Sequence, residues 1–179
     1  HLSSGEFVTV IGAIGDDREL AAVLALEGEP GVEKVVPILK PYKLVSREFH
    51  RADRVLEIAG RKVGGDNFCL ISGPCTVETR EQTLETAKVC RDVGSTMLRG
   101  GAFKPRTSPY TFQGLGKPAL EILAEARELT GLPIVTECMD IRQLDDVLEV
   151  ADVIQLGARN MQNFDLLAEV GRSGRAVLL

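Results

Sequence analysis

Four side chains that can do chemistry, Cys75, Arg99, Glu137 and Arg159, each stand at or just after the end of a short apolar segment. If these segments are parallel strands, their carboxyl ends meet at one edge of the sheet. Ligands of parallel α/β folds bind at that edge, whereas residues at the opposite edge serve stability. The sequence therefore predicts that the four side chains contribute to one site.

A basic stretch, Lys104-Pro105-Arg106-Thr107-Ser108-Pro109, follows Arg99 and adds two further cations. Its prolines stiffen the backbone and hold Lys104 and Arg106 in an extended segment. Guanidinium groups bind phosphate and carboxylate groups through paired hydrogen bonds, and an ammonium group adds a point charge. Together with Arg99 and Arg159, this stretch predicts a small substrate with several negative charges.

Each of these residues also has a purely structural interpretation. A single arginine or lysine is most often a solvated surface charge, and a single cysteine is more often a buried apolar residue than a metal ligand. Glu137 could simply pair with one of the arginines. The two histidines, His1 and His50, are interpreted as structural or solvated. The common placement of the other residues at strand ends favours the functional interpretation.

The composition is that of an ordinary globular protein, with 179 residues of which 44% are hydrophobic and 26% charged. A net charge of -5 argues against a nucleic-acid or membrane surface, because either would need clustered Lys and Arg. There is no long apolar run and no signal-peptide pattern, so a cytoplasmic location is expected. Cys69, Cys75, Cys90 and Cys138 lack the close pairs of a zinc site and are expected to be free thiols.

Strand-like and helix-like segments alternate through the second part of the chain. Apolar and β-branched runs predict strands over residues 68–72, 96–99, 133–137, 153–156 and 176–179. Helix start and stop signals predict four helices: one after the capping box Thr79/Gln82 and before Gly94, one over 117–130 closed by Gly131, one starting at Asp140 with Gln143, and one from near Asn160 to before Gly171. This alternation is typical of a parallel sheet wrapped by helices.

The first part of the chain predicts a smaller β-α-β unit, with strands over 7–14 and 32–39 and a helix over 16–27. A charged connector follows, in which 55–58 is expected to turn through Gly60 and form a hairpin. The predicted domains are therefore residues 1–40, a connector over 41–66, and residues 67–179.

Three motifs make the chain resemble a known enzyme family. Gly73-Pro74-Cys75-x-Val77-Glu78, the stretch from Leu98 to Pro109, and Gln155-x-Gly157-Ala158-Arg159-Asn160 resemble 3-deoxy-D-arabino-heptulosonate 7-phosphate (DAHP) synthases of the shorter microbial type. Residues 1–40 resemble the ferredoxin-like regulatory domain of some of these enzymes. The resemblance implies an α/β fold with about the first half of a (β/α)₈ TIM barrel, preceded by part of a ferredoxin-like α+β domain. Both ends of the chain are then expected to be truncated.

The resemblance also implies an activity, the condensation of phosphoenolpyruvate with erythrose 4-phosphate to give DAHP and phosphate. This reaction is the first step of the shikimate pathway to the aromatic amino acids. Cys75 matches the cysteine ligand of the family's divalent metal ion, which is Mn, Fe, Zn or a similar ion. The partner histidine, glutamate and aspartate positions of the family would lie beyond Leu179.

The resemblance further implies roles for the charged residues. Arg99, Lys104 and Arg159 match positions that bind phosphoenolpyruvate, and Arg106 and Thr107 match contacts to erythrose 4-phosphate. Ser108 is also predicted to bind substrate. Glu137 matches an acidic group near the reacting carbons. Lys104 and Glu137 are therefore the predicted catalytic residues, and both are also predicted to contact substrate.

Two alternatives remain open from the sequence. A 3-deoxy-D-manno-octulosonate 8-phosphate synthase shares the barrel and a similar Gly-Pro-Cys strand, but its second loop differs from Lys-Pro-Arg-Thr. The chain could also be a non-catalytic regulatory or assembly module that binds an aromatic amino acid through its first domain. A homo-oligomer, either a tetramer or a dimer, is expected, and the 179-residue piece alone is expected to be inactive.

Overall fold

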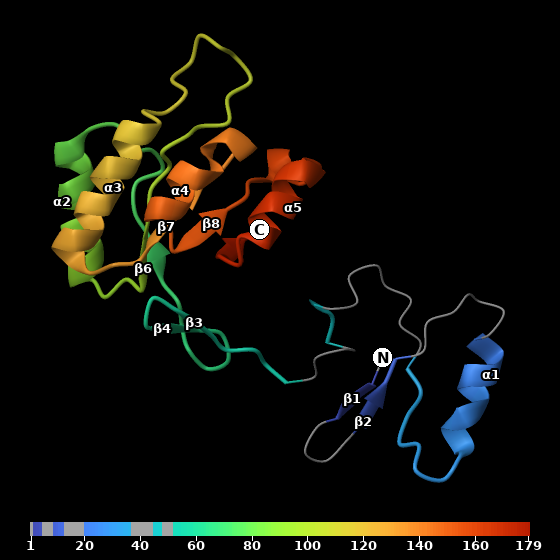
Figure 1. The fold of residues 1–179 in the computed structure, drawn as a ribbon. Coiled ribbons are helices and arrows are strands. Elements are labelled where there is room, and N and C mark those ends of the chain that lie inside the picture. The colour runs from blue at the N-terminus through green and yellow to red at the C-terminus, as the bar shows by residue number, and fades with distance from the viewer. Residues whose placement is uncertain (1, 5–8, 13–19, 37–44, 48–51) are drawn as a thin grey trace. The chain divides into compact units, whose positions relative to one another are not determined.

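The computed structural model describes residues 2–4, 9–12, 20–36, 45–47 and 52–179. The chain divides into two compact units, His1–Asp53 and Arg54–Leu179. Figure 1 shows the ribbon of both units. Among the described residues, none of the helices has the length and apolar character needed to cross a membrane.

The described part of the first unit contains a small antiparallel sheet and one short helix. Strand β1 (Leu2–Ser4) pairs with β2 (Thr9–Ile11), and helix α1 (Leu20–Leu24) continues into the 3₁₀ turn η1 (Ala25–Gly28). The predicted strand and helix of this region are confirmed over these residues, and the rest of both predictions lies outside the described residues. The partner strand β1 was not predicted.

The second predicted strand of this unit, over 32–39, is wrong for the part that the structure describes. Residues 32–36 have no strand conformation, and 37–39 lie outside the described residues. A strand is defined by backbone pairing with a neighbouring strand. In the described part of this unit the only ladder joins β1 and β2, so the valine-rich pattern of 32–36 has no partner there.

The second unit is built on a five-stranded parallel sheet in the order β5-β6-β7-β8-β9. The strands are β5 (Ile71–Ser72), β6 (Met97–Arg99), β7 (Ile134–Glu137), β8 (Val153–Gln155) and β9 (Ala176–Leu178). All five predicted strands are confirmed. The first is shorter than predicted, and Phe68 at its predicted start is largely exposed.

Four helices connect these strands, namely α2 (Arg80–Asp92), α3 (Lys117–Thr130), α4 (Leu144–Val150) and α5 (Phe164–Arg172). The hydroxyl of Thr79 accepts a hydrogen bond from the backbone N–H of Gln82 at 3.2 Å, which caps α2 as predicted. Gly131 closes α3 in the left-handed conformation that glycine adopts without steric cost. A 3₁₀ turn η3 (Ile141–Gln143) capped by Asp140 leads into α4.

The predicted limits of the last helix need correction. Residues near Asn160 form a separate 3₁₀ turn, η4 (Ala158–Asn160), and α5 begins after Asn163, whose side chain caps it. The helix also runs through Gly171 to Arg172 instead of ending before the glycine. Ser173 covers the last carbonyl groups, and Gly174 takes the positive φ that ends a helix. The predicted stop was therefore placed at the wrong glycine.

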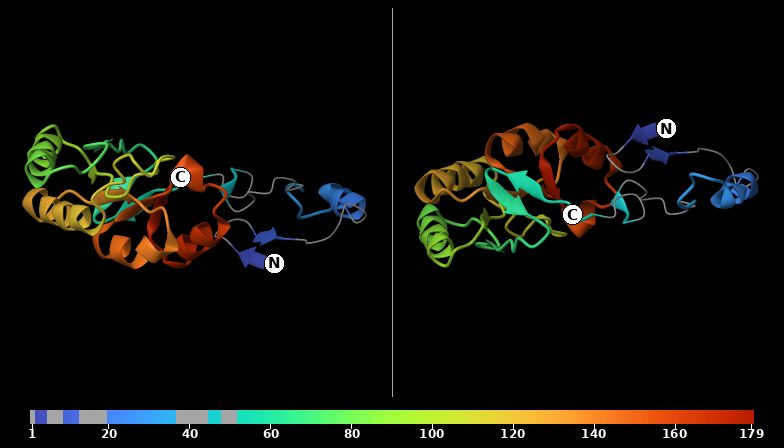
Figure 2. Two further views of the ribbon diagram at one scale, coloured as in Figure 1. Left: turned by 90° about the horizontal axis from the view of Figure 1, so that it is seen from above. Right: turned by 90° about the horizontal axis from the view of Figure 1, so that it is seen from below.

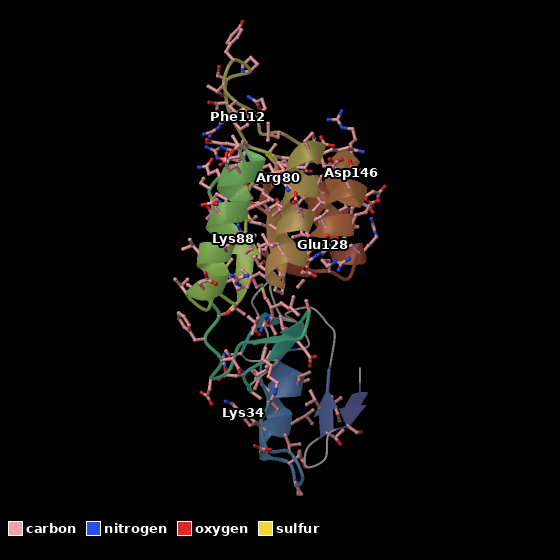
Figure 3. All side chains as sticks on the ribbon, turned by 90° about the vertical axis from the view of Figure 1, so that its left-hand side faces the viewer. Lys34, Arg80, Lys88, Phe112, Glu128 and Asp146 are labelled. Atoms are coloured by element: carbon pink, nitrogen blue, oxygen red, sulfur yellow. The ribbon has the colours of Figure 1, made fainter. Side chains whose placement is uncertain are left out.

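The helices follow one another along one face of the curved sheet (Figure 2). Alternate strand residues, including Leu98, Ile134 and Ile154, are buried between sheet and helices in the main hydrophobic core. Ion pairs at the helix surface join Arg80 of α2 to Glu125 of α3, and Lys117 of α3 to Asp146 of α4 (Figure 3). Because these ion pairs are exposed, the apolar core contributes most of the packing energy.

The opposite face of the sheet has two layers. Near the amino ends of the strands, Met97, Val135 and Val153 form a second buried apolar cluster, against which Ile58 and Val63 pack. These last two residues belong to a hairpin of β3 (Leu56–Ile58) and β4 (Arg61–Val63). The predicted hairpin is therefore present. Its turn has positive φ at Ala59 and Gly60, as in a type I′ turn.

The second layer lies two residues further along the same strands. Side chains alternate between the two faces of a strand, so residues two apart share a face. Arg99, Glu137 and Gln155 thus lie on the same face as the apolar layer, at the carboxyl ends of β6, β7 and β8. The sheet places its polar residues where the sequence predicted a site.

Candidate functional site

A basic cluster forms around the backbone carbonyl of Cys75. The Nζ of Lys104 donates a hydrogen bond to this oxygen at 2.8 Å, and Nη1 of Arg99 donates to it at 3.1 Å. Lys104 is only 6% exposed, and its Nζ lies 3.5 Å from the Sγ of Cys75. Two cations from different segments therefore converge beside one thiol.

Gly101 makes this approach possible. A Cβ at this position would lie 2.7 Å from the carbonyl oxygen of Cys75 and 3.1 Å from Nζ of Lys104. Such distances are too short for ordinary packing, so a larger residue would push the lysine away from the carbonyl. Glycine is therefore needed at position 101 because a side chain there would collide with the Cys75 carbonyl and the Lys104 ammonium group.

The loop between β6 and α3 is closed at its base by backbone hydrogen bonds. Lys104 N–H donates to the carbonyl of Gln113 at 2.9 Å, and Gly116 N–H donates to that of Ala102 at 3.0 Å. Gly114 has a φ of +91°, and a Cβ there would lie 2.2 Å from the carbonyl oxygen of Ala102. The loop therefore extends beyond the ends of the helices, and Phe112 lies on it (Figure 3).

Ser108 organises the outer part of this loop. Its hydroxyl accepts from the N–H of Tyr110, and its carbonyl accepts from Oγ1 of Thr111 at 2.8 Å and Nε2 of Gln113 at 2.9 Å. Arg106 and Thr107 are exposed, and across the described residues their side chains have no hydrogen-bond or ion-pair partner. The loop therefore holds one cation free at its surface.

A second chain of contacts crosses the carboxyl ends of three strands. Arg99 Nε donates to Oε1 of Gln155 at 3.2 Å, and Nε2 of Gln155 donates to Oε2 of Glu137 at 3.5 Å. Glu137 is 5% exposed. A Cβ on Gly157 would lie 2.3 Å from Oε1 of Glu137, so this glycine leaves room for the carboxylate.

The structure thus brings Cys75, Arg99, Lys104 and Glu137 into one continuous set of contacts. Arg159 is exposed on η4, and in the described part of the chain its side chain has neither a hydrogen-bond nor an ion-pair partner. Arg106, Thr107 and Ser108 lie on the loop between β6 and α3. Their roles stay predictions.

The two cations change the acidity of the thiol beside them. The hydrogen bond from Arg99 and then the charge of Lys104 lower the pKa of Cys75 below that of an ordinary cysteine. Cys138 shows the opposite effect, because burial raises the pKa of its thiol. Cys75 is also exposed, whereas Cys138 is fully buried. Only Cys75 of this pair has the environment of a reactive or metal-binding thiol.

A complete metal site is not formed by the described residues, which contain no group of three or more His, Cys, Asp or Glu side chains placed to hold an ion. Cys75 alone offers one thiolate, and a stable divalent site needs several ligands. The described residues therefore fit one ligand of such a site and not the whole of it.

Sequence reasoning missed Gln155 and Gly157 as parts of the site, although both belong to a quoted motif. Gln155 is a polar residue at the carboxyl end of a buried strand, which was an available signal. Its neighbours on β6 and β7 could not be read from the sequence, because they depend on the register that pairs Glu137 with Gln155.

Comparison with protein families gives matches over both parts of the chain. Residues 50–179 match the DAHP synthetase I family, and residues 1–40 match the DAHP synthase ferredoxin-like domain. The chain spans about half the length of the relatives that it matches.

The relatives include a phospho-2-dehydro-3-deoxyheptonate aldolase of Thermotoga maritima. It is 52% identical over 179 residues, which are 100% of this chain and 53% of the relative. A crystal structure of the DAHP synthase of that organism matches with a TM-score of 0.76 and 51% identity. The match covers 100% of this chain and 52% of the crystallised chain. The structure of a truncated form of the Thermotoga maritima enzyme matches with a TM-score of 0.67 and 44% identity. This match covers 76% of this chain and 48% of the truncated chain.

A more distant relative is a 2-dehydro-3-deoxyphosphooctonate aldolase of Citrifermentans bemidjiense, 33% identical over 132 residues, or 69% of this chain and 48% of the relative. The matches confirm the expected fold class, which is α/β with about half of a TIM barrel after a ferredoxin-like domain.

Proposed function

Because the chain belongs to the DAHP synthetase I family, we propose that the protein condenses phosphoenolpyruvate with erythrose 4-phosphate to give DAHP and phosphate. The observation that carries this proposal is the convergence of two cations, the buried Lys104 and the half-buried Arg99, on the carbonyl of Cys75. Fixed cations at the carboxyl edge of a parallel sheet are suited to a small substrate with several negative charges.

Charge neutralisation is the first task of the site. The two substrates carry two phosphates and a carboxylate, which repel one another unless cations lie between them. Arg99 and Lys104 are held in place before substrate arrives, so little reorganisation is needed when the anion binds. We assign phosphoenolpyruvate to these two residues and Arg159, and erythrose 4-phosphate to exposed Arg106 and Thr107 with the neighbouring, half-buried Ser108.

Bond formation joins the methylene carbon of phosphoenolpyruvate to the aldehyde carbon of erythrose 4-phosphate. The aldehyde oxygen takes up a proton, water adds to the resulting cationic carbon, and phosphate leaves. Lys104 and Glu137 are the proposed catalytic residues. We assign to Lys104 the stabilisation of negative charge beside the thiol, and to the buried carboxylate of Glu137 the task of holding or moving a proton near the reacting carbons.

A divalent metal ion is part of this proposal, with Cys75 as one of its ligands. When bound, it would supply Lewis-acid activation of the aldehyde oxygen. The lowered pKa of Cys75 supports this assignment, since a thiolate is the form that binds metal. The identity of the ion, Mn, Fe, Zn or similar, is best determined from metal content after purification.

The test is a condensation assay on the full chain that the gene encodes, with purified phosphoenolpyruvate and either of two aldehydes. We expect product and phosphate release with erythrose 4-phosphate and little with arabinose 5-phosphate, the five-carbon aldehyde of octulosonate synthases. The reverse preference would replace the proposal with the octulosonate alternative. Absence of reaction with both aldehydes, in protein with bound divalent metal, would count against both.

Regulation and assembly extend the proposal. The match of residues 1–40 to the ferredoxin-like domain supports an aromatic amino acid effector at this part of the chain. A homo-oligomer, tetramer or dimer, and a cytoplasmic location belong to the same proposal. Light scattering of the purified protein and cell fractionation test these two points.

A further inference from the structure

The side chain of Gln155 lies between two oppositely charged groups and uses both ends of its amide. Its oxygen accepts from Nε of Arg99 at 3.2 Å, and its nitrogen donates to Oε2 of Glu137 at 3.5 Å. The same Arg99 donates through Nη1 to the carbonyl of Cys75. One neutral side chain therefore joins the arginine of the basic cluster to the buried carboxylate.

The orientation of this amide is fixed by its neighbours. If it were turned over, its NH₂ group would face the N–H of Arg99, and its oxygen would face a carboxylate oxygen of Glu137. Both contacts would be repulsive, so only the observed orientation satisfies all three groups. Arg99 and Glu137 thus fix the orientation of the Gln155 amide. The amide in turn restrains the positions of the Arg99 guanidinium and the Glu137 carboxylate.

The surroundings prevent the carboxylate from relaxing elsewhere. Glu137 and Gln155 are register partners on β7 and β8, which fixes their backbones relative to each other. The other carboxylate oxygen of Glu137 lies against Gly157, where even a Cβ would come within 2.3 Å. Because Glu137 is almost fully buried, it has little freedom to find another donor.

We propose that Gln155 is a positioning residue that fixes the Arg99 guanidinium and the Glu137 carboxylate relative to each other, and so sets the separation between the anion-binding and proton-handling parts of the site. This inference rests on the proposed function. The two hydrogen bonds of Gln155, to Arg99 and to Glu137, can be removed together or one at a time by substitution.

Two substitutions test the two ends of the amide in the full chain that the gene encodes. Gln155→Met keeps the size and removes both hydrogen bonds, so both KM for phosphoenolpyruvate and kcat should worsen, together by about tenfold to a hundredfold. Gln155→Glu keeps an acceptor for Arg99 and places a second carboxylate against Glu137. Its KM for phosphoenolpyruvate should stay within about threefold of the parent, while kcat falls at least about tenfold.

Gln82→Met and Gln82→Glu are the matched controls, since Gln82 is an exposed glutamine at the start of α2. Both controls should leave KM and kcat unchanged. Melting temperature and metal content, measured for all variants, separate loss of fold from loss of positioning. If either Gln155 variant does not fold, Gln155→Asn takes its place, because a shorter amide reaches only one neighbour and should still lower kcat/KM.

The outcomes are distinct. A residue that only packs would tolerate methionine, so a folded Gln155→Met protein with parental KM and kcat overturns the proposal. Equal effects of methionine and glutamate on KM would also overturn it, since the acceptor to Arg99 would then not matter. Failure of the parent protein to condense the two substrates would instead refute the proposed function itself.

Discussion

The carbonyl oxygen of Cys75 accepts hydrogen bonds from two cations, and the thiol of the same residue lies beside them. This single residue therefore organises the cluster through its backbone and would act through its side chain. Its two roles respond differently to substitution, because a change of side chain leaves the carbonyl in place.

Cys75→Ser separates the packing and ligand interpretations. An exposed cysteine that only fills space would tolerate serine, with melting temperature and turnover close to the parent. A ligand would not, because a serine hydroxyl ionises far less readily than a thiol near a divalent ion. We expect bound metal and turnover to be lost while the fold remains. Full metal content with normal turnover would refute the assignment.

Alkylation of metal-free protein tests the electrostatics at the same residue. The cations favour the thiolate and lower the pKa of Cys75, so its reaction with iodoacetamide should accelerate at a lower pH than that of a free cysteine. Lys104→Met should shift this profile to higher pH, since one cation is lost. Buried Cys138, whose pKa is raised, serves as the internal control and should react last. An identical profile for both thiols, followed by mass spectrometry, would contradict the prediction.

Arg106 and Arg159 are exposed cations that the proposal gives to different substrates. Arg106→Ala should raise KM for erythrose 4-phosphate by about tenfold to a hundredfold and change KM for phosphoenolpyruvate much less. Arg159→Ala should do the reverse. Arg142→Ala, at an exposed arginine paired with Asp140, is the control. Equal effects of the two variants on both substrates would show that the two phosphates are wrongly assigned.

At the scale of the element, the loop between β6 and α3 depends on glycines more than on its prolines. Two backbone hydrogen bonds close its base, and Gly114 passes within contact of the carbonyl of Ala102. The loop carries Arg106 at its exposed part, so its geometry sets where that cation can reach a substrate.

Gly114→Ala and Gly131→Ala form a matched pair that tests this dependence. Both glycines have positive φ, 91° and 69°, so alanine should cost about 1 to 2 kcal/mol of stability at Gly131 and more than that at Gly114. Only Gly114 has backbone in the way, at 2.2 Å, whereas nothing lies within 4 Å of a Cβ at Gly131. We expect KM for erythrose 4-phosphate to rise in Gly114→Ala and to stay unchanged in Gly131→Ala. Similar KM values in both variants would show that the loop base does not position the cation.

Local sequence signals predicted the elements of the second unit well, because each depends on residues close in the chain. Thr79 and Gly131 set the ends of their helices through hydrogen bonds and backbone angles that are properties of the residues themselves. The end of α5 was missed, since Gly171 and Gly174 are both credible stops, and Ser173 decides between them by capping the last turn. The predicted strand over 32–39 failed where it is described, because strand formation needs a partner that the pattern does not specify.

The arrangement of the candidate site was predictable only in part. Strand ends predicted that Cys75, Arg99 and Glu137 lie near one another, and the structure joins them with Lys104 in one set of contacts. The bridging role of Gln155 was not predictable, because it arises from lateral contacts with two strands distant in the sequence. The exposed positions of Arg106 and Arg159 are likewise set by loop geometry that the basic pattern does not determine.

At the scale of the whole molecule, the family matches divide the chain into a first part over 1–40 and a second over 50–179, and the contacts divide it after Asp53. The predicted limits of 1–40, 41–66 and 67–179 stay a prediction. The packing of Ile58 and Val63 against the sheet indicates that the hairpin folds with the second unit.

Deletion of residues 1–40 from the full chain should therefore leave condensation activity and remove inhibition by an aromatic amino acid. The hairpin and the sheet pack together within the second unit, Arg54–Leu179. Turnover with and without tyrosine or phenylalanine measures both effects. Retained inhibition in the deletion variant would place the effector site elsewhere.

The apolar and polar layers on the sheet face opposite the helices limit how this sequence can change in evolution. On β6, β7 and β8 an apolar residue of the packed layer and a polar residue of the site are two positions apart, so their relation is fixed by the alternation of the strand. Substitutions in one layer can accumulate without moving the other. A one-residue insertion or deletion within β7 would instead turn Glu137 towards the helices and Thr136 towards the site. Length variation among descendants of this chain should therefore collect in the exposed loop after Lys104, while the strands vary by substitution alone.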